Sequence, residues 1–168
     1  MNRDNRGVSL IEMMIVVALI TLMAGLMGFG ISLIASKPAQ QCAQKIMYSV
    51  ERNRVKAMGK MSSQLKFYMD GGKVYVVEAV EKNQTSGLVS STPSEIGDKV
   101  TVVVTFADGS TSDLSSYSSS APLIVEFTRD SGSLKKTGST YVKSFTVSKG
   151  SKVHTVSIEK LTGKVTMQ

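Results

Sequence analysis

The hydrophobic positions of the chain fall into three patterns, and the first is an uninterrupted apolar stretch near the N-terminus. Residues 13–36 contain no Asp, Glu, Lys or Arg. A helix rises about 1.5 Å per residue, so a helix of this length would reach roughly 36 Å and would span a bilayer with some tilt. We therefore expect a transmembrane helix over residues 8–36, preceded by a polar leader over residues 1–7.

The second pattern predicts an amphipathic helix over residues 37–62. Apolar residues recur there at steps of three and four, which places them on one face of a helix. These positions are Ala39, Cys42 or Ala43, Ile46, Val50, Ala57 and Met61. One gap in the stripe falls near Asn53. Pro38 either starts this helix or kinks it, so we expect residues 8–62 to form one bent helix whose apolar stripe covers another surface.

The third pattern is the alternation of apolar and polar residues over residues 63–168, which is typical of antiparallel strands joined by short turns. The sequences "QLKFYM" and "KVYVVEAV" flank "DGG" and predict a hairpin, and further turns are expected at residues 149–151 and 162–163. Two stretches, residues 83–97 and 108–122, are predicted to be solvated loops. We expect a sheet of six or seven strands packed on the helix, and hence an α+β fold.

The net charge of +7 is unevenly distributed along the chain. Residues 37–66 hold seven basic residues and one acid, residues 67–134 hold four basic residues and nine acids, and residues 135–168 hold seven lysines and one acid. Such blocks favour docking between neighbouring copies of the protein or, for the basic blocks, binding of an anionic polymer. The alternative is a solvated surface without a partner.

Candidate catalytic residues are few. The one cysteine, Cys42, excludes an intrachain disulfide, and at an apolar helical position we expect a small core residue rather than a reactive thiol. The one histidine, His154, lies in an expected strand without a second histidine to complete a metal site. No phosphate-binding glycine loop is present in the sequence. We therefore expect no enzymatic activity, no cofactor and no metal.

A motif at the start of the apolar stretch carries the most specific signal. The sequence "RG" followed by "VSLIEMMIVVALITLMAGL" combines a short basic leader that ends in Gly7, then Val8, a hydroxyl residue, Leu-Ile-Glu and a long apolar run. This order resembles the type III signal of type IV prepilins and type II secretion pseudopilins. Val8 stands where that family most often has Phe.

The resemblance implies a processing route and a set of partners. A membrane-embedded prepilin peptidase would cut between Gly7 and Val8 on the cytoplasmic face and would methylate the new amino group of Val8. The mature subunit would cross the cytoplasmic membrane once, in contact with membrane lipid, with its C-terminal domain outside. An inner-membrane assembly platform would then add it to other pilin or pseudopilin subunits in a surface filament or pseudopilus. An ordinary signal-anchor is the alternative, because residues 37–56 are as basic as the leader.

A carboxylate inside this apolar stretch, Glu12, requires a physical reason. A charged side chain costs about 2.5–3.5 kcal/mol at the centre of a transmembrane helix and less near its end, so it marks a functional position. After cleavage Glu12 would lie five residues into the chain, and the nearest cation would be the new α-amino group. The amine of one helix, facing the carboxylate of the next, would fix the axial stagger of an incoming subunit. We therefore predict that Glu12 sets the register of assembly.

Two weaker resemblances point to the minor pseudopilin or FimT-like branch of the same family, and thus to the pilin fold. The sequence "VERNRVKAM" is similar to the helix of that branch, with Arg54, Ala57 and Met58 at the matching positions. The closing pattern of an apolar strand with Phe, a glycine turn and "VSIEKLTGKV" is similar to its C-terminal domain. These resemblances imply a minor or initiating subunit.

Three functions follow from these patterns. The first, which we favour, is a structural subunit of a type IV pilus or pseudopilus that assembles through its N-terminal helix. The second is the capture of DNA on such a fibre, since clustered lysines bind phosphates. The candidate residues are Lys143, Lys149, Lys152, Lys160 and Lys164, with Lys135 and Lys136 near them in the chain. The third is a membrane-anchored β-domain without a filament role.

Overall fold

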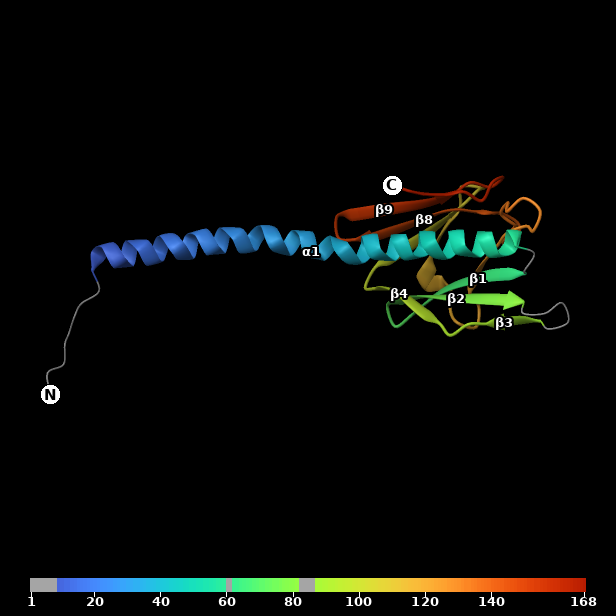
Figure 1. Cartoon of the computed structure of the whole chain (residues 1–168), viewed down its shortest axis with the longest axis horizontal. Coiled ribbons are helices and arrows are strands. Elements are labelled where there is room, and N and C mark those ends of the chain that lie inside the picture. The colour runs from blue at the N-terminus through green and yellow to red at the C-terminus, as the bar shows by residue number, and fades with distance from the viewer. Residues whose placement is uncertain (1–8, 60–61, 82–86) are drawn as a thin grey trace. The chain divides into compact units, whose positions relative to one another are not determined.

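The computed structural model describes residues 9–59, 62–81 and 87–168, without the side chains of residues 26–36. Its elements confirm the predicted α+β class (Figure 1). In chain order they are α1 (Leu10–Met58), β1 (Ser63–Asp70), β2 (Lys73–Glu81), β3 (Leu88–Ser90), β4 (Ser94–Asp98), β5 (Thr101–Phe106), β6 (Thr111–Asp113), the 3-10 helix η1 (Leu114–Ser116), β7 (Leu123–Glu126), β8 (Val142–Lys149), β9 (Lys152–Ile158) and β10 (Val165–Met167).

Both predicted helical segments belong to one helix, α1. It begins after Ser9 and ends where the N–H of Gly59 donates to the carbonyl of Val55 (3.0 Å). Pro38 lies inside the helix. Pro38 has no backbone N–H, so the helix lacks one backbone hydrogen bond at this position. The predicted stripe position Met61 lies outside the described residues.

The chain divides into an N-terminal unit, Met1–Ala35, and a C-terminal unit, Ser36–Gln168. The part of α1 in the C-terminal unit buries the predicted apolar stripe, whose residues Ala39, Cys42, Ala43, Ile46, Val50 and Ala57 are each at most 1% exposed. Asn53, at the gap in the stripe, is also fully buried, and its Nδ2 donates to Oγ of Ser63 at the start of β1. Buried polar groups require such partners. The gap is therefore a polar tie between α1 and β1.

Sheet A is antiparallel and consists of β1, β2, β3, β4 and β7. Its strand order is β3-β2-β1-β7, and β4 also pairs with β2. The predicted β1–β2 hairpin is confirmed, because Asp70 pairs with Lys73 across Gly71 and Gly72. Both glycines have positive φ (56° and 77°), a conformation that glycine adopts readily and other residues do not.

Sheet B is antiparallel and has the strand order β10-β9-β8-β5-β6. The turns predicted at residues 149–151 and 162–163 are confirmed, with Gly150 at φ 61° and Gly163 at φ 64°. The face of sheet B that points into the C-terminal unit is built from apolar residues at every second position of β5 and β8, such as Val102, Val104 and Phe145, all fully buried. Sheet B therefore contributes one face to the hydrophobic core.

The prediction of a single sheet with six or seven strands is corrected by this layout, because the described strands divide between sheets A and B. The chain first changes sheets between β4 and β5, where Lys99 has a φ of 52°, in the left-handed region that non-glycine residues adopt at a cost. It changes sheets again before and after β7. The rings of Phe67 in sheet A and Phe145 in sheet B have centroids 5.2 Å apart. One hydrophobic cluster includes α1 and both sheets, so the C-terminal unit has one core.

Both stretches predicted to be solvated loops contain regular structure. Residues 83–97 include β3 and most of β4, and residues 108–122 include β6 and η1. The Asp113 carboxylate caps η1 by accepting a hydrogen bond from the N–H of Ser115 (2.8 Å). Leu114 is fully buried in the core. One apolar side chain thus anchors a segment whose composition alone favours a solvated loop.

Candidate functional site

The N-terminal part of α1, residues 10–25, presents apolar side chains to all sides. Their exposed fractions run from 45% for Val16 to 79% for Leu10. The exposed large side chains are Leu10, Ile11, Met13, Met14, Ile15, Val16, Val17, Leu19, Ile20, Leu22 and Met23. A helix that is apolar on every face requires lipid or other apolar helices around it. Among the residues that the structure describes, no helix meets the length and apolarity of a membrane span, so the transmembrane helix stays a prediction.

Glu12 lies in the first turn of α1 among these apolar side chains, and it is exposed. Ser9 caps the helix: its Oγ accepts from the N–H of Ile11 (3.3 Å) and its carbonyl accepts from the N–H of Met13 (3.1 Å). A carboxylate three residues after such a cap is favourable by about 0.3–1 kcal/mol near the positive end of the helix dipole. Sequence reasoning missed this second reason for Glu12, although the spacing of Ser9 and Glu12 signals it.

Three of the five candidate lysines line one groove at an end of sheet B. Lys143 is the extra residue of a β-bulge where β8 pairs with β5, and its side chain is exposed. It lies with Lys160 and Lys164 along a groove of about 460 Å³ that also includes Glu159. The Lys160 Nζ lies 4.4 Å from the ring centroid of Tyr141, which is a cation–π contact. The structure thus brings Lys143, Lys160 and Lys164 together.

The other two candidate lysines lie apart from this groove. Lys149 and Lys152 pair with each other across the β8–β9 hairpin. Lys149 is six residues along β8 from Lys143, which corresponds to about 20 Å. Among the ion pairs of the described residues, none includes any of the five candidates, whereas Lys135 pairs with Glu126 (3.3 Å). The candidates therefore form two groups rather than one surface.

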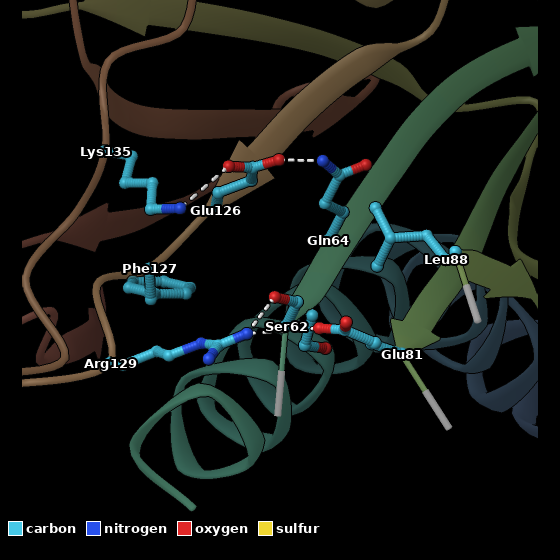
Figure 2. Close-up of a pocket in the computed structure, with 10 residues that line it drawn as sticks. Ser62, Gln64, Glu81, Leu88, Glu126, Phe127, Arg129 and Lys135 are labelled. Carbon is cyan, nitrogen blue, oxygen red and sulfur yellow. Dashed lines mark hydrogen bonds and ion pairs between the residues drawn. The ribbon is translucent and has the colours of Figure 1, made fainter. Parts of the chain in front are cut away.

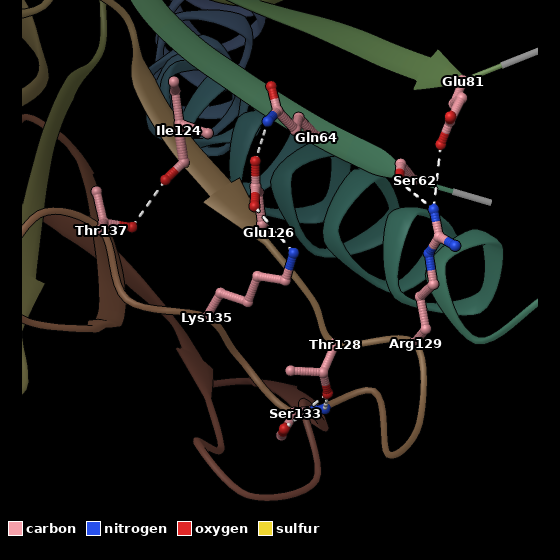
Figure 3. A network of polar contacts seen from close by, with 10 residues as sticks. All are labelled: Ser62, Gln64, Glu81, Ile124, Glu126, Thr128, Arg129, Ser133, Lys135 and Thr137. Atoms are coloured by element: carbon pink, nitrogen blue, oxygen red, sulfur yellow. Dashed lines mark hydrogen bonds and ion pairs between the residues drawn. The ribbon is translucent and has the colours of Figure 1, made fainter. Parts of the chain in front are cut away.

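A second cavity, of about 360 Å³, lies where the ends of β1, β2 and β7 meet the turn that follows β7 (Figure 2). Arg129 binds the carboxylate of Glu81 (3.1 Å), and Lys135 binds Glu126 (3.3 Å), which also accepts from Gln64 (Figure 3). Each of these charged side chains has a partner of opposite sign. The ion pairs that line the cavity therefore connect the turn after β7 to sheet A. Sequence reasoning missed these pairs, because Arg129 and Glu81 are 48 residues apart.

The predicted processing residues Gly7 and Val8 lie outside the described residues. The family model of the prokaryotic N-terminal methylation motif matches residues 2–28, which include Gly7, Val8 and Glu12. The chain carries the type IV prepilin or pseudopilin signal. No curated protein and no solved structure matches the chain. The matched residues include none of sheets A and B, so the resemblance to the minor pseudopilin or FimT-like branch stays a prediction.

The prepilin signal bears on the processing, the assembly and the location of the protein. It supports a type IV pilin-like or pseudopilin subunit, and it implies assembly with other pilin subunits and processing by the prepilin peptidase. It is also consistent with membrane insertion and a surface filament. The apolar helix that is exposed on all sides and the exposed Glu12 are the described parts of this signal.

The cysteine and the histidine both belong to the C-terminal unit. Cys42 is fully buried, and a Cβ at Gly97 in β4 would lie 2.7 Å from its Sγ. Burial raises the pKa of the Cys42 thiol to about 12, so the thiol stays protonated at neutral pH. His154 is half-buried in β9. Within residues 9–59, 62–81 and 87–168, no group of three His, Cys, Asp or Glu side chains is placed to hold a metal ion.

Proposed function

We propose that the protein is a structural subunit, and a minor one, of a type IV pilus or pseudopilus. The observation that carries this proposal is a helix with apolar side chains on all faces and a carboxylate in its first turn, which lies within the matched N-terminal methylation motif. Such a helix buries its apolar side chains in lipid, or against the same helices of other subunits when these replace the lipid. The proposed role is structural and involves no catalysis.

The proposed route begins with a single membrane crossing by residues 8–36, with the C-terminal domain outside the cytoplasmic membrane. Prepilin peptidase removes residues 1–7 by cleavage after Gly7 and methylates Val8. The new amino group then supplies the counter-charge for Glu12 of a neighbouring subunit. An inner-membrane assembly platform adds the subunit to the filament.

Mass spectrometry of the protein from native membranes and sheared filaments tests this route. We expect a chain that starts at Val8 and carries one methyl group on its amine. Gly7→Val is expected to reduce cleavage to near zero, because the β-branched side chain alters the residue at the scissile bond. Gly25→Val makes the same substitution in α1, away from the scissile bond, and is the matched control, since no atom lies within 4 Å of a Cβ at Gly25. Assembled protein that retains residues 1–7 would show the proposal to be wrong.

A second candidate function, binding of a phosphate polymer such as DNA, is favoured by the grouping of Lys143, Lys160 and Lys164 in one groove. Three lysine–phosphate contacts predict an affinity whose logarithm falls with the logarithm of salt concentration with a slope of about −2 to −3. We expect the triple Gln variant of this groove to lose that slope in a binding titration of the full chain in micelles. The Lys149→Gln/Lys152→Gln variant is the control with a similar loss of charge. Undetectable binding at low salt would exclude this function.

A further inference from the structure

A second basic cluster lies at the end of the C-terminal unit at which α1 enters it. One cavity at this end is lined by Pro38 and Gln41 of α1, by residues 95–98 of β4 and by Lys149 of the β8–β9 hairpin. In Figure 1 this hairpin, in red, lies beside the same stretch of α1. Lys152 faces Lys149 across the hairpin. Two lysines are thus held next to the first residues of the C-terminal unit.

The two lysines of this pair repel each other. Like charges at directly opposite positions of an antiparallel pair are destabilising, and Lys149 and Lys152 occupy such positions. The described ion pairs give neither lysine an acidic partner. The nearby carboxylate of Glu95 is held instead by Lys73 (2.8 Å). The positive charge of both lysines is therefore available to an external anion.

Further charges at this end have the same sign. Lys37 and Lys45 are exposed on α1, and Lys99 is exposed at the corner between β4 and β5, where its N–H donates to the carbonyl of Gly72 (3.1 Å). Asp98 lines the same cavity and is the opposing charge there, beside the paired Glu95. The lysines of the cluster outnumber these acids. We name Lys37, Lys45, Lys99, Lys149 and Lys152 the basic collar.

The position of the basic collar in the chain indicates what it meets. Lys37 is the first charged residue after the uncharged residues 13–36. When those residues occupy the apolar core of a bilayer, chain connectivity places Lys37 at the headgroup layer, and Pro38, which shares a cavity with Lys149, follows at once. Lysine side chains at such positions extend to the phosphates of anionic lipids, and each contributes roughly fivefold to binding.

We propose that the basic collar docks the C-terminal unit on anionic lipid headgroups before assembly, with Lys149 and Lys152 as the principal contacts. This inference rests on the proposed function, because it requires the subunit to stand in a membrane. The docked unit is held at the surface from which a subunit enters the filament. Its release is driven by the exchange of lipid phosphates for contacts with neighbouring subunits.

The test uses the full chain in vesicles of phosphatidylcholine alone or mixed with phosphatidylglycerol. A fluorophore on Ser151→Cys reports the position of the hairpin, and labelling is selective because Cys42 is buried. A nitroxide on the lipid headgroups quenches the fluorophore when the hairpin docks. We expect stronger quenching in the anionic vesicles, a weaker effect at high salt, and a shift of the docked-to-undocked ratio by roughly fivefold for each of Lys149→Gln and Lys152→Gln.

Lys135→Gln/Lys136→Gln is the matched control, because it removes the same charge at exposed residues outside the basic collar and outside the groove of Lys143, Lys160 and Lys164, and we expect it to leave quenching unchanged. Quenching that is equal in the two vesicle types, or unaffected by Lys149→Gln/Lys152→Gln, would overturn the inference. A loss of filament assembly in that variant without a change in quenching would also overturn it, since the collar would then contact another subunit. Failure of the chain to float with either vesicle type would instead contradict the proposed function.

Discussion

Glu12→Gln is expected to abolish filament assembly while membrane insertion stays at the wild-type level. The substitution keeps the size of the side chain and removes its charge, so the apolar helix enters lipid more easily. In the filament, the α-amino group of a neighbouring subunit would remain without a counter-charge in an apolar setting. Removing one partner of a buried ion pair costs about 3–5 kcal/mol. If the free energy of assembly changes by this amount, the fraction of assembled subunits falls at least a hundredfold. Vesicle flotation measures insertion, and the yield of sheared filaments measures assembly.

Two control variants separate this role of Glu12 from simpler ones. Ser9→Ala removes the side-chain oxygen that caps α1 by accepting a hydrogen bond from the N–H of Ile11. Loss of such a cap lowers the stability of a helix by about 0.5–2 kcal/mol. Glu51→Gln makes the same chemical change at an exposed position of α1 in the C-terminal unit. Equal losses of assembly in Ser9→Ala and Glu12→Gln would assign Glu12 to the cap. Normal filaments from Glu12→Gln would show that Glu12 does not set the register of assembly.

The parts of the fold that depend on neighbours in the sequence were predictable. The stripe from Ala39 to Ala57 repeats with the period of a helix, and the β1–β2 hairpin has its turn residues, Gly71 and Gly72, between two alternating runs. Both signals act over a few residues, so sequence alone is sufficient to read them. The polar gap at Asn53 was visible as a gap, but its partner Ser63 was not.

The division into two sheets was not predictable, because it depends on which distant strands pair. The first change of sheet occurs at Lys99, whose left-handed conformation has no glycine to signal it. Leu114 was missed for a related reason: one apolar residue in a Ser-rich stretch makes no periodic pattern, yet it is fully buried. Long-range packing decided both features, whereas local composition favoured a different outcome.

In the candidate site, too, the local features were predictable from the sequence and the features that depend on distant strands were not. The prepilin signal is contiguous from Gly7 through Glu12 and beyond, so it was readable without any structure. The grouping of the candidate lysines could not be predicted without the register of sheet B. The bulge at Lys143 and the six residues that separate it from Lys149 place two groups at opposite ends of β8. A count of lysines in the sequence does not contain that information.

Two glycine turns of the C-terminal unit contact each other above α1, and they carry the second large prediction. The turns are joined by a hydrogen bond from the N–H of Leu134 to the carbonyl of Lys160 (3.0 Å). Gly163 has a φ of 64° and is buried, and a Cβ there would overlap the carbonyl oxygen of Gly132 and lie 3.0 Å from Cδ of Arg54. The side chain of Arg54 thus fills the space beneath both turns. The weak resemblance that singled out Arg54 coincides with a packing role for this residue.

Gly163→Ala is expected to destabilise the C-terminal unit by about 3–5 kcal/mol, a large part of the stability of a domain this size. The new methyl group overlaps a backbone oxygen, so one of the two turns, which the Leu134–Lys160 hydrogen bond joins, must shift. The methyl group also strains the left-handed conformation. Urea unfolding of the full chain in micelles, followed by circular dichroism, measures the loss.

Two other glycines with the same backbone conformation provide a graded control for Gly163→Ala. Gly138→Ala shares the positive φ (65°) but has no atom within 4 Å of the added Cβ, so it costs only the backbone strain, about 1–2 kcal/mol. Gly132→Ala is expected to lie between the two, because the Cβ meets the flexible side chain of Met58 at 2.8 Å. The predicted order of destabilisation therefore isolates steric overlap from φ. Equal losses for Gly138→Ala and Gly163→Ala would mean that the two turns separate freely and that their contact above Arg54 adds no stability.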